Sequence, residues 1–387
     1  MSAEKILTRD FVLSFLAQFA FSSVFFILIP TIPIYLSRLG STDAEIGVLV
    51  GVLSVSSLIL RPFVGRALLR IPERKFMMAG TILFIFSSVA YLLAPPFWPL
   101  LIVRVFQGIG LALFATASFT LVSRISPEAR RGQSLGIFYL AINLAFALAP
   151  AFGMIVINSS NFTTLFFLCT GLSLCALLII LKLGRIEGDP LENSSPHNQA
   201  FLSREALPSA IISFMACIIW GALTAFFPLF ALSHGISNPG LFFGVFAIIL
   251  ILGRSLGGRI LDTYNREKVI FPCLVVQIIA MTTLVFSTTF PMLILVAVIW
   301  GTGSAFLFPS LVAHALDRTG DARGPAIATY MALADLGAGM GSVIMGIILQ
   351  LTSYTTMFFC LVVTGVINLL YFYFFVRKRG RDRYANL

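Results

Sequence analysis

Long apolar runs, separated by short polar turns, follow one another along the whole chain. The first six lie at about 11–36, 45–65, 76–94, 97–123, 133–157 and 162–183. After a polar stretch, six more lie at about 209–233, 241–261, 269–289, 292–315, 326–351 and 354–376. A helix needs roughly 20 apolar residues to cross the hydrocarbon core of a bilayer. The pattern therefore predicts an all-α membrane protein with twelve transmembrane helices.

The composition argues against a water-soluble fold. Hydrophobic residues make up 58% of the 387 residues and charged residues only 11%, whereas soluble domains average about 45–50% apolar and about 25% charged residues. The mean hydropathy is +0.99. Because twelve spans of about 20 residues use about 240 residues, the chain has no room for a large soluble domain.

The polar stretch from Arg185 to Pro208 divides the chain into two halves. We expect a six-helix bundle over 1–184, a cytoplasmic linker over 185–208, and a second six-helix bundle with a basic tail over 209–387. A shift of 193 residues brings matching positions into register: Arg61, Gly65, Arg66, Gly108 and Gly110 fall on Arg254, Gly258, Arg259, Gly301 and Gly303. The two bundles are therefore predicted to be pseudo-symmetric parallel repeats, and the functional site is expected in a cavity between them.

The basic residues indicate the orientation of the chain. The sequence has 26 Lys and Arg residues against 16 Asp and Glu, a net charge of +10. Nearly all of the basic residues lie in the amino terminus, alternate turns, the linker and the tail, whereas the opposite side holds only Arg38. By the positive-inside rule, both termini are cytoplasmic. We expect a multi-pass protein of the bacterial inner (plasma) membrane that binds no nucleic acid. Its basic tail is expected to anchor the topology, with attraction of anionic membrane lipids as the alternative role.

The sequence carries no recognisable signature of catalysis or metal binding. The five cysteines lie inside apolar runs without paired ligand spacing, so neither a disulfide nor a metal site is predicted. We find no nucleophile elbow, phosphate-binding loop or paired-histidine zinc motif. We therefore expect no cofactor, no enzymatic activity and no ATP-driven transport.

Two charged residues inside the spans are candidates for proton coupling. Arg104 lies in the fourth run, and Asp335 is the only acid well inside any predicted span. A charge at mid-membrane costs about 2.5–3.5 kcal/mol or more unless it is paired or hydrated, so Arg104 is expected to face the interior. Gln107 follows Arg104 by three residues and shares its helix face. The alternative for both charges is a structural role in fixing helix packing.

Gln107 is a candidate for the substrate cavity, together with other polar or amphipathic residues in the spans: Gln18, Tyr139, Asn143 and Trp220. The alternative for each is a hydrogen bond or contact to a neighbouring helix. At the start of the second span, Thr42 and Glu45 have the spacing of a capping box. His314 is expected to be structural.

Three segments resemble the signatures of a known family. The fourth run reads Arg104-Val-Phe-Gln107-Gly108-Ile-Gly110-Leu-Ala112, the turn after the second span contains Pro62, Gly65, Arg66 and Arg70, and the fifth run contains Ala149-Pro150-Ala-Phe-Gly153. On these motifs the chain resembles the major facilitator superfamily, and within it the twelve-span drug and metabolite proton antiporters.

The resemblance implies a set of gating residues. They are Gly65, Arg66 and Arg70 in the first half, Gly258, Arg259, Asp262 and Arg266 in the second half, and Pro150 in the fifth span. Leu69 stands where the family usually has an acid, whereas the second-half copy keeps that acid as Asp262. We therefore expect the cytoplasmic latch to work from one half.

The resemblance also implies a function. We expect a monomeric secondary active transporter that exports a small amphipathic drug or metabolite by proton antiport through alternating access, with Asp335 and Arg104 in proton coupling. Its partners would be a small-molecule substrate and protons. A proton-linked importer or a facilitator of a small polar solute is the alternative, because it shares every topological feature. A membrane-embedded enzyme is a remote alternative, since it needs a catalytic constellation that the sequence does not display.

Overall fold

The chain folds almost entirely into membrane-length helices. The computed structural model describes residues 7–127, 130–184, 203–263, 265–319 and 323–377, and within the helices it leaves out the side chains of 131–132, 256–263, 318–319, 323–325 and 377. The described residues contain twelve α-helices, a short terminal π-helix and no strand. The prediction of an all-α protein with twelve helices is thus confirmed. Most of the predicted linker lies outside the described residues.

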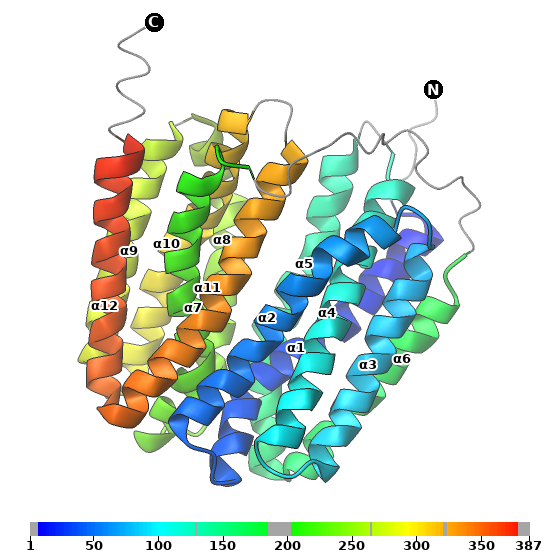
Figure 1. Cartoon of the computed structure of the whole chain (residues 1–387), viewed down its shortest axis with the longest axis horizontal. Coiled ribbons are helices and arrows are strands. Elements are labelled where there is room, and N and C mark those ends of the chain that lie inside the picture. The colour runs from blue at the N-terminus through cyan, green and yellow to red at the C-terminus, as the bar shows by residue number, and fades with distance from the viewer. Residues whose placement is uncertain (1–6, 128–129, 185–202, 264, 320–322, 378–387) are drawn as a thin grey trace, which may run out of the picture. The chain divides into compact units, whose positions relative to one another are not determined.

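The helices follow the predicted runs closely (Figure 1). In the first half they are α1 (Arg9–Arg38), α2 (Asp43–Ala67), α3 (Glu73–Leu93), α4 (Trp98–Ile125), α5 (Arg131–Ser159) and α6 (Phe162–Leu181). In the second half they are α7 (Leu207–Ser233), α8 (Gly240–Thr263), α9 (Arg266–Val285), α10 (Phe290–Thr319), α11 (Arg323–Leu351) and α12 (Tyr354–Tyr371), followed by the π-helix Phe372–Arg377. In the described residues, eleven helices are long and apolar enough to cross a membrane, and α8 contributes a shorter apolar stretch, Gly240–Ser255.

Local capping explains where several of these helices begin. The Thr8 hydroxyl accepts a hydrogen bond from the Phe11 amide at 3.3 Å at the start of α1. At the start of α2, the Thr42 amide donates to the Glu45 carboxylate at 2.8 Å, and the Glu45 amide donates to the Thr42 hydroxyl at 3.3 Å. This reciprocal pair is the capping box that the sequence predicts, and it satisfies two backbone donors that a helix start leaves free.

Met1–Ser41 and Val52–Ser195 form one compact unit. In it, α1 packs on α5 and α6, and α3 packs on α4 and α6. Its core is aromatic: the Phe21 ring of α1 stacks on Phe114 of α4 at 3.8 Å and meets Phe84 of α3 at 4.3 Å between centroids. Large apolar side chains such as Phe86 and Leu93 remain exposed, as expected for helices whose outer faces meet lipid tails.

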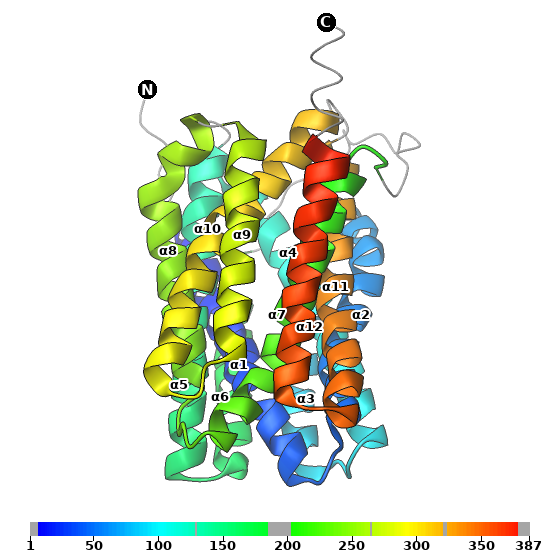
Figure 2. The ribbon, with the colours of Figure 1, turned by 90° about the vertical axis from the view of Figure 1, so that its left-hand side faces the viewer.

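Thr42–Gly51 and Pro196–Leu387 form the second compact unit. In it, α7 packs along α11, and α10 packs on α8 and α9. The helices α9 and α12 also lie side by side (Figure 2). The backbones of α7 and α11 approach closely because Gly337 and Gly341 face the backbone of Phe214 and Ile218. Small residues at such contacts are the usual way in which membrane helices pack tightly.

Candidate transport site

Arg104 is buried inside the first unit, with 7% of its surface exposed. Its Nη1 donates to Oε1 of Gln107 at 2.8 Å, one helical turn further along α4. The Tyr91 hydroxyl of α3 donates to the same oxygen at 2.6 Å. The guanidinium also interacts electrostatically with the Tyr91 phenol. The expectation that Arg104 faces the interior and shares a face with Gln107 is therefore met.

Two further aromatic side chains pack around Tyr91. Tyr91 is fully buried, and its ring stacks on Phe166 of α6 at 5.2 Å between centroids. Tyr35 of α1 meets Phe166 edge-on at 5.0 Å and donates its hydroxyl proton to the Tyr91 carbonyl at 2.6 Å. Residues of α1 and α6 thus position Tyr91, which in turn bonds the buried Arg104–Gln107 pair of α4, and a polar contact in such a buried place is stronger than it would be in water.

The two glycines of the fourth-helix motif are required by packing. A Cβ atom on Gly108 would overlap the Leu53 carbonyl and Ser56 hydroxyl of α2. A Cβ atom on Gly110 would lie 2.9 Å from the carbonyl oxygen of Gly80 in α3. Their second-half counterparts behave alike, since Gly301 faces Ile249 of α8 and Gly303 faces Cys273 of α9. These glycines therefore let the neighbouring helices approach the helix that carries Arg104.

Three of the other cavity candidates lie in the first unit. Gln18 of α1 is buried, donates to the Ser22 hydroxyl at 2.8 Å and accepts from the Ser118 hydroxyl of α4 at 2.8 Å. Asn143 is half-buried in α5, and Tyr139 is 43% exposed with its ring near Phe119. Gln18 thus cross-links two helices, and a role for it in binding substrate remains a prediction.

Asp335 lies in the middle of α11, in the second unit, and is half-buried. It lies within electrostatic range of Cys217 in α7. Two residues further on, Gly337 faces the backbone of Phe214, also in α7. The acid therefore stands beside the tightest contact of its unit, where an uncompensated negative charge would be costly.

Trp220 belongs to an aromatic cluster built by three helices of the second unit. Its ring lies 5.7 Å from Trp300 of α10 and 5.9 Å from Phe246 of α8. Trp300 and Phe246 are 4.2 Å apart, and both are buried. Trp220 itself is half-buried. Of the three rings, only that of Trp220 is partly exposed, so it alone presents apolar ring surface outside the cluster.

The predicted gating residues are placed as follows. Gly65, Arg66 and Arg70 are exposed at the end of α2 and in the turn after it, and Pro150 is buried inside α5. Gly258, Arg259 and Asp262 lie in α8 at positions whose side chains are outside the described part of the structure. A gating role for these residues remains a prediction.

Each unit has an ion pair at the same place in the repeat. Glu73 at the start of α3 pairs with Arg124 near the end of α4 at 3.5 Å. Arg266 at the start of α9 pairs with Asp317 near the end of α10 at 3.6 Å. A shift of 193 residues places Glu73 on Arg266 and Arg124 on Asp317, so the acidic and basic partners are exchanged between the two pairs. The gating candidate Arg266 is therefore fixed to the neighbouring helix of its own unit.

Sequence reasoning missed Tyr91, which completes the Arg104 centre. A signal was present, because Tyr91 lies two residues before the end of α3 and the short turn to α4 makes the two helices antiparallel. Such a hairpin places Tyr91 opposite the first turns of α4, where Arg104 is found. Ser118, the partner of Gln18, had no such signal, since the two residues are 100 positions apart.

Comparison with known proteins identifies the family. The profile of the Major Facilitator Superfamily matches residues 14–279 and 210–386. A staphylopine export protein of Staphylococcus aureus is 24% identical over 347 residues, covering 84% of this chain and 86% of that protein. The quinolone resistance protein NorA of the same organism is 29% identical over 127 residues, 33% of each chain.

The fold comparison agrees with the sequence comparison. A mutant of the nucleoside transporter NupG has 13% sequence identity and a TM-score of 0.81, covering 94% of this chain and 99% of that one. The chain is thus a multi-pass integral membrane transporter of a small molecule and not an enzyme. It belongs to the Major Facilitator Superfamily.

Proposed function

We propose that this transporter exports a small amphipathic drug or metabolite in exchange for protons, by alternating access, with Asp335 as the proton carrier. The observation that carries the proposal is the position of Asp335, a half-buried acid at the middle of a membrane-spanning helix. Export is supported by the names of two relatives, a staphylopine export protein and a quinolone resistance protein.

A half-buried carboxyl has the chemistry that proton coupling needs. Burial favours its neutral form and a nearby positive charge or hydration favours its ionised form, so a change of environment changes its proton occupancy. When Asp335 is exposed to the outside it takes up a proton, and when it is exposed to the inside it releases one. If one net charge moves inward per cycle, a potential of about 100 mV supplies about 2.3 kcal/mol, which is roughly a fiftyfold accumulation.

Arg104 and Gln107 are proposed as the polar anchor of the first unit. The side-chain oxygen of Gln107 accepts hydrogen bonds from both Arg104 and Tyr91, which holds the Arg104 guanidinium in place. Trp220 supplies the apolar face in the second unit through its ring cluster. We further propose a monomer in the bacterial inner membrane with both termini cytoplasmic, consistent with the basic residues of the turns and tail.

The test uses everted membrane vesicles and a panel of fluorescent dyes, drugs and metabolites. We expect uptake of some of these compounds to require an imposed pH gradient in the wild type. Asp335→Asn should lose the gradient-dependent component while the purified variant stays monodisperse and folded, and Asp335→Glu should keep part of it. Uptake that ignores the gradient in both the wild type and Asp335→Asn would refute proton antiport and leave a facilitator. Gradient-driven uptake only in right-side-out vesicles would make the protein an importer.

A further inference from the structure

His314 of α10 is a buried titratable group that has no part in proton exchange by Asp335 alone. The exposed fraction of His314 is 5%. Its Nδ1 atom shares a hydrogen bond of 2.7 Å with the Ser209 hydroxyl of α7. Ser209 lies in the first turn of α7, and His314 lies near the end of α10. The bond therefore joins the two helices near one end of the second unit.

Ser209 is the first of three polar side chains on one face of α7. Ser213 and Cys217 follow it at intervals of four residues, which places the three side chains one above another on the helix surface. Ser209 and Ser213 are fully buried, and Cys217 is 8% exposed. These three residues, here called the polar row, therefore lead from the start of α7 toward its middle.

The contacts between α7 and α11 give the height at which the acid of α11 lies. Gly337 faces the backbone of Phe214, and Gly341, four residues later, faces the backbone of Ile218, also four residues later. The two helices therefore run in the same direction. Because Asp335 precedes Gly337 by two residues, it lies at the level of the residues just before Phe214. The acid is thus level with the polar row.

The Ser213 hydroxyl is not used to bond its own helix. Its oxygen is buried and makes no well-formed hydrogen bond within the described part of the chain, whereas the buried Thr81 hydroxyl donates to the carbonyl four residues before it. The Ser213 hydroxyl lies beside the Cys217 thiol, and this thiol lies within electrostatic range of Asp335. A hydroxyl can donate one proton and accept another, so Ser213 retains the capacity to pass a proton on.

The other end of the row comes within one helical turn of a solvent-facing charge. Asp317 follows His314 by three residues on α10, its side chain is 60% exposed, and it pairs with Arg266. α10 packs on α7, α8, α9 and α11. The charged or titratable residues of these four helices whose side chains the structure describes are Cys217 on α7, Arg254 on α8, Arg266, Glu267, Lys268 and Cys273 on α9, and Tyr330 and Asp335 on α11.

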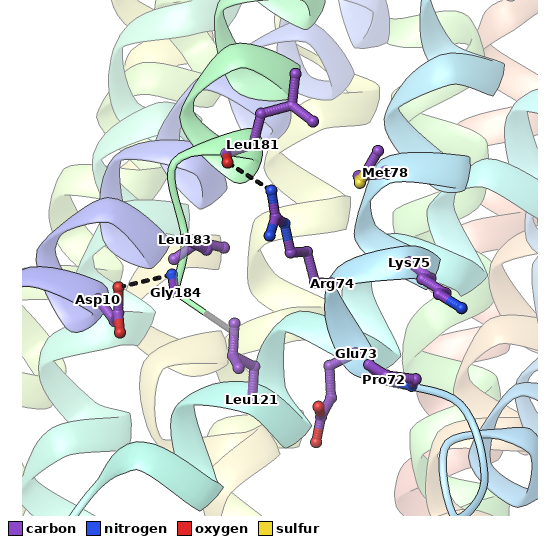
Figure 3. A pocket seen from close by; sticks show the side chains of 10 residues that line it. All are labelled: Asp10, Pro72, Glu73, Arg74, Lys75, Met78, Leu121, Leu181, Leu183 and Gly184. Carbon is purple, nitrogen blue, oxygen red and sulfur yellow. Dashed lines mark hydrogen bonds between the residues drawn. The ribbon is translucent and has the colours of Figure 1, made fainter. Parts of the chain in front are cut away.

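Packing of the repeat requires neither a histidine nor an acid at these positions. The shift of 193 residues places His314 on Leu121 of α4 and Asp335 on an isoleucine of α5. Figure 3 shows Leu121 in the wall of a cavity of about 720 Å³, which Asp10 and Arg74 also line, where α1 and α3 begin and α4 and α6 end. Apolar side chains thus fill both positions in the first unit, so the titratable pair of the second unit points to a role beyond packing.

We propose that Ser213, Ser209 and His314 carry protons between Asp335 and the end of the second unit at which α7 begins. The proposal rests on the function proposed above for Asp335. The Asp335 carboxyl releases its proton beside Ser213, and each serine hydroxyl accepts one proton and gives up its own. Side chains four residues apart have Cβ atoms about 5–6 Å apart, a span that one water molecule closes. Ser209 then gives its proton to Nδ1 of His314, and the imidazolium loses a proton to water, so all three residues return to their starting state.

The experiment follows the protonation of Asp335 in the purified full-length protein in detergent. Time-resolved infrared spectroscopy records the carboxyl band after a rapid change of the bulk pH. The band that is lost in Asp335→Asn belongs to this residue. The probe is the proton itself, so the measurement needs no transported compound. It gives both the midpoint pH at which Asp335 is half protonated and the rate at which its protonation changes.

The variants are His314→Gln, Ser213→Ala and Ser209→Ala, each with its melting temperature measured in the same detergent. The matched controls are Ser233→Ala and His234→Gln. These two residues form a second serine–histidine pair, 3.2 Å apart, at the opposite end of α7.

We expect protonation of Asp335 to change about tenfold more slowly in each of the three variants than in the wild type, at an unchanged midpoint pH. A positioned proton-transfer group contributes about 10²–10⁴-fold to a rate, and water replaces part of that contribution. Ser213→Thr keeps the hydroxyl and should keep the wild-type rate, as should both controls. If His314→Gln fails to fold, the contrast between Ser213→Ala and Ser213→Thr still tests the path.

The possible failures are distinguishable. Wild-type rates in His314→Gln and Ser213→Ala would overturn the proposal and leave Asp335 as the proton carrier. A changed midpoint pH or melting temperature without a changed rate would give these residues a structural role and would also overturn it. If no pH-dependent band disappears in Asp335→Asn, the acid does not exchange protons, and both the path and the proposed function are overturned.

Discussion

Replacing Gly80 of α3 by alanine should destabilise the first unit, even though alanine is the better helix former. A Cβ atom at this position would lie 2.6 Å from the carbonyl oxygen of Gly110 and 2.8 Å from the backbone nitrogen of Phe114, both in α4. Neither atom is the flexible end of a side chain. To restore an ordinary contact of 3.4 Å, the two helices must separate locally by about 0.8 Å.

The size of the effect follows from two opposing contributions. Overpacking of a tight contact costs about 1–3 kcal/mol, and the replacement of glycine by alanine inside a helix returns about 0.5–1 kcal/mol. The central values leave a net loss for Gly80→Ala of about 1 kcal/mol, within outer limits of about 0 and 2.5 kcal/mol. For a unit of this size, a loss of about 1 kcal/mol lowers the melting temperature by roughly 2–4 °C. Moving α3 and α4 apart would also lengthen the 2.6 Å hydrogen bond from the Tyr91 hydroxyl to Gln107, which joins these two helices.

The matched control is Gly171→Ala in α6. A Cβ atom on Gly171 would have nothing within 4 Å, so this variant should be as stable as the wild type or slightly more stable. Fluorescence-detected thermal unfolding of the purified proteins in one detergent measures both. The reasoning is refuted if Gly80→Ala melts at the wild-type temperature, or if Gly171→Ala loses as much stability as Gly80→Ala.

Three smaller effects can be measured with the same assay. Tyr91→Phe keeps the ring stacked on Phe166 but removes the hydroxyl that donates to Gln107, so it should lower the free energy of unfolding by about 1 kcal/mol. An unchanged melting temperature would mean that this hydrogen bond adds nothing to stability. Glu73→Gln and Asp317→Asn each remove the acid of an ion pair. The loss of stability should be about 1 kcal/mol for Glu73→Gln and less than about 0.5 kcal/mol for Asp317→Asn, because the Glu73 side chain is 5% exposed and the Asp317 side chain is 60% exposed. A larger loss for Asp317→Asn than for Glu73→Gln would contradict this explanation. Ser209→Ala removes the 2.7 Å hydrogen bond to Nδ1 of the buried His314 and should cost about 1 kcal/mol. The exposed Ser353→Ala loses the helix cap to the Thr356 amide and a 3.2 Å contact with the Thr356 hydroxyl, and it should cost about 0.5 kcal/mol. Equal losses in the two variants would contradict the role given to burial.

The sequence alone determined the helices and their repeat. All twelve runs became helices with bounds close to those predicted, because a segment surrounded by lipid must satisfy its backbone hydrogen bonds internally and needs a fixed length to cross the bilayer. The capping box of Thr42 and Glu45 was predictable for the same reason, since its partners are three residues apart. The burial of Arg104 followed from the cost of exposing its charge to lipid.

Only the tertiary structure decided which side chains meet. The helices are apolar around most of their circumference, so hydropathy does not reveal which face points to a neighbour or at what height two helices cross. The contact of Tyr91 with Gln107, the bond between Gln18 and Ser118 and the approach of Gly110 to Gly80 all depend on that rotation and register. The cavity lined by Asp10 and Arg74 depends on four helix ends that are distant in the sequence. Close packing of backbones sets these positions, and that packing is a property of the folded unit rather than of any one segment.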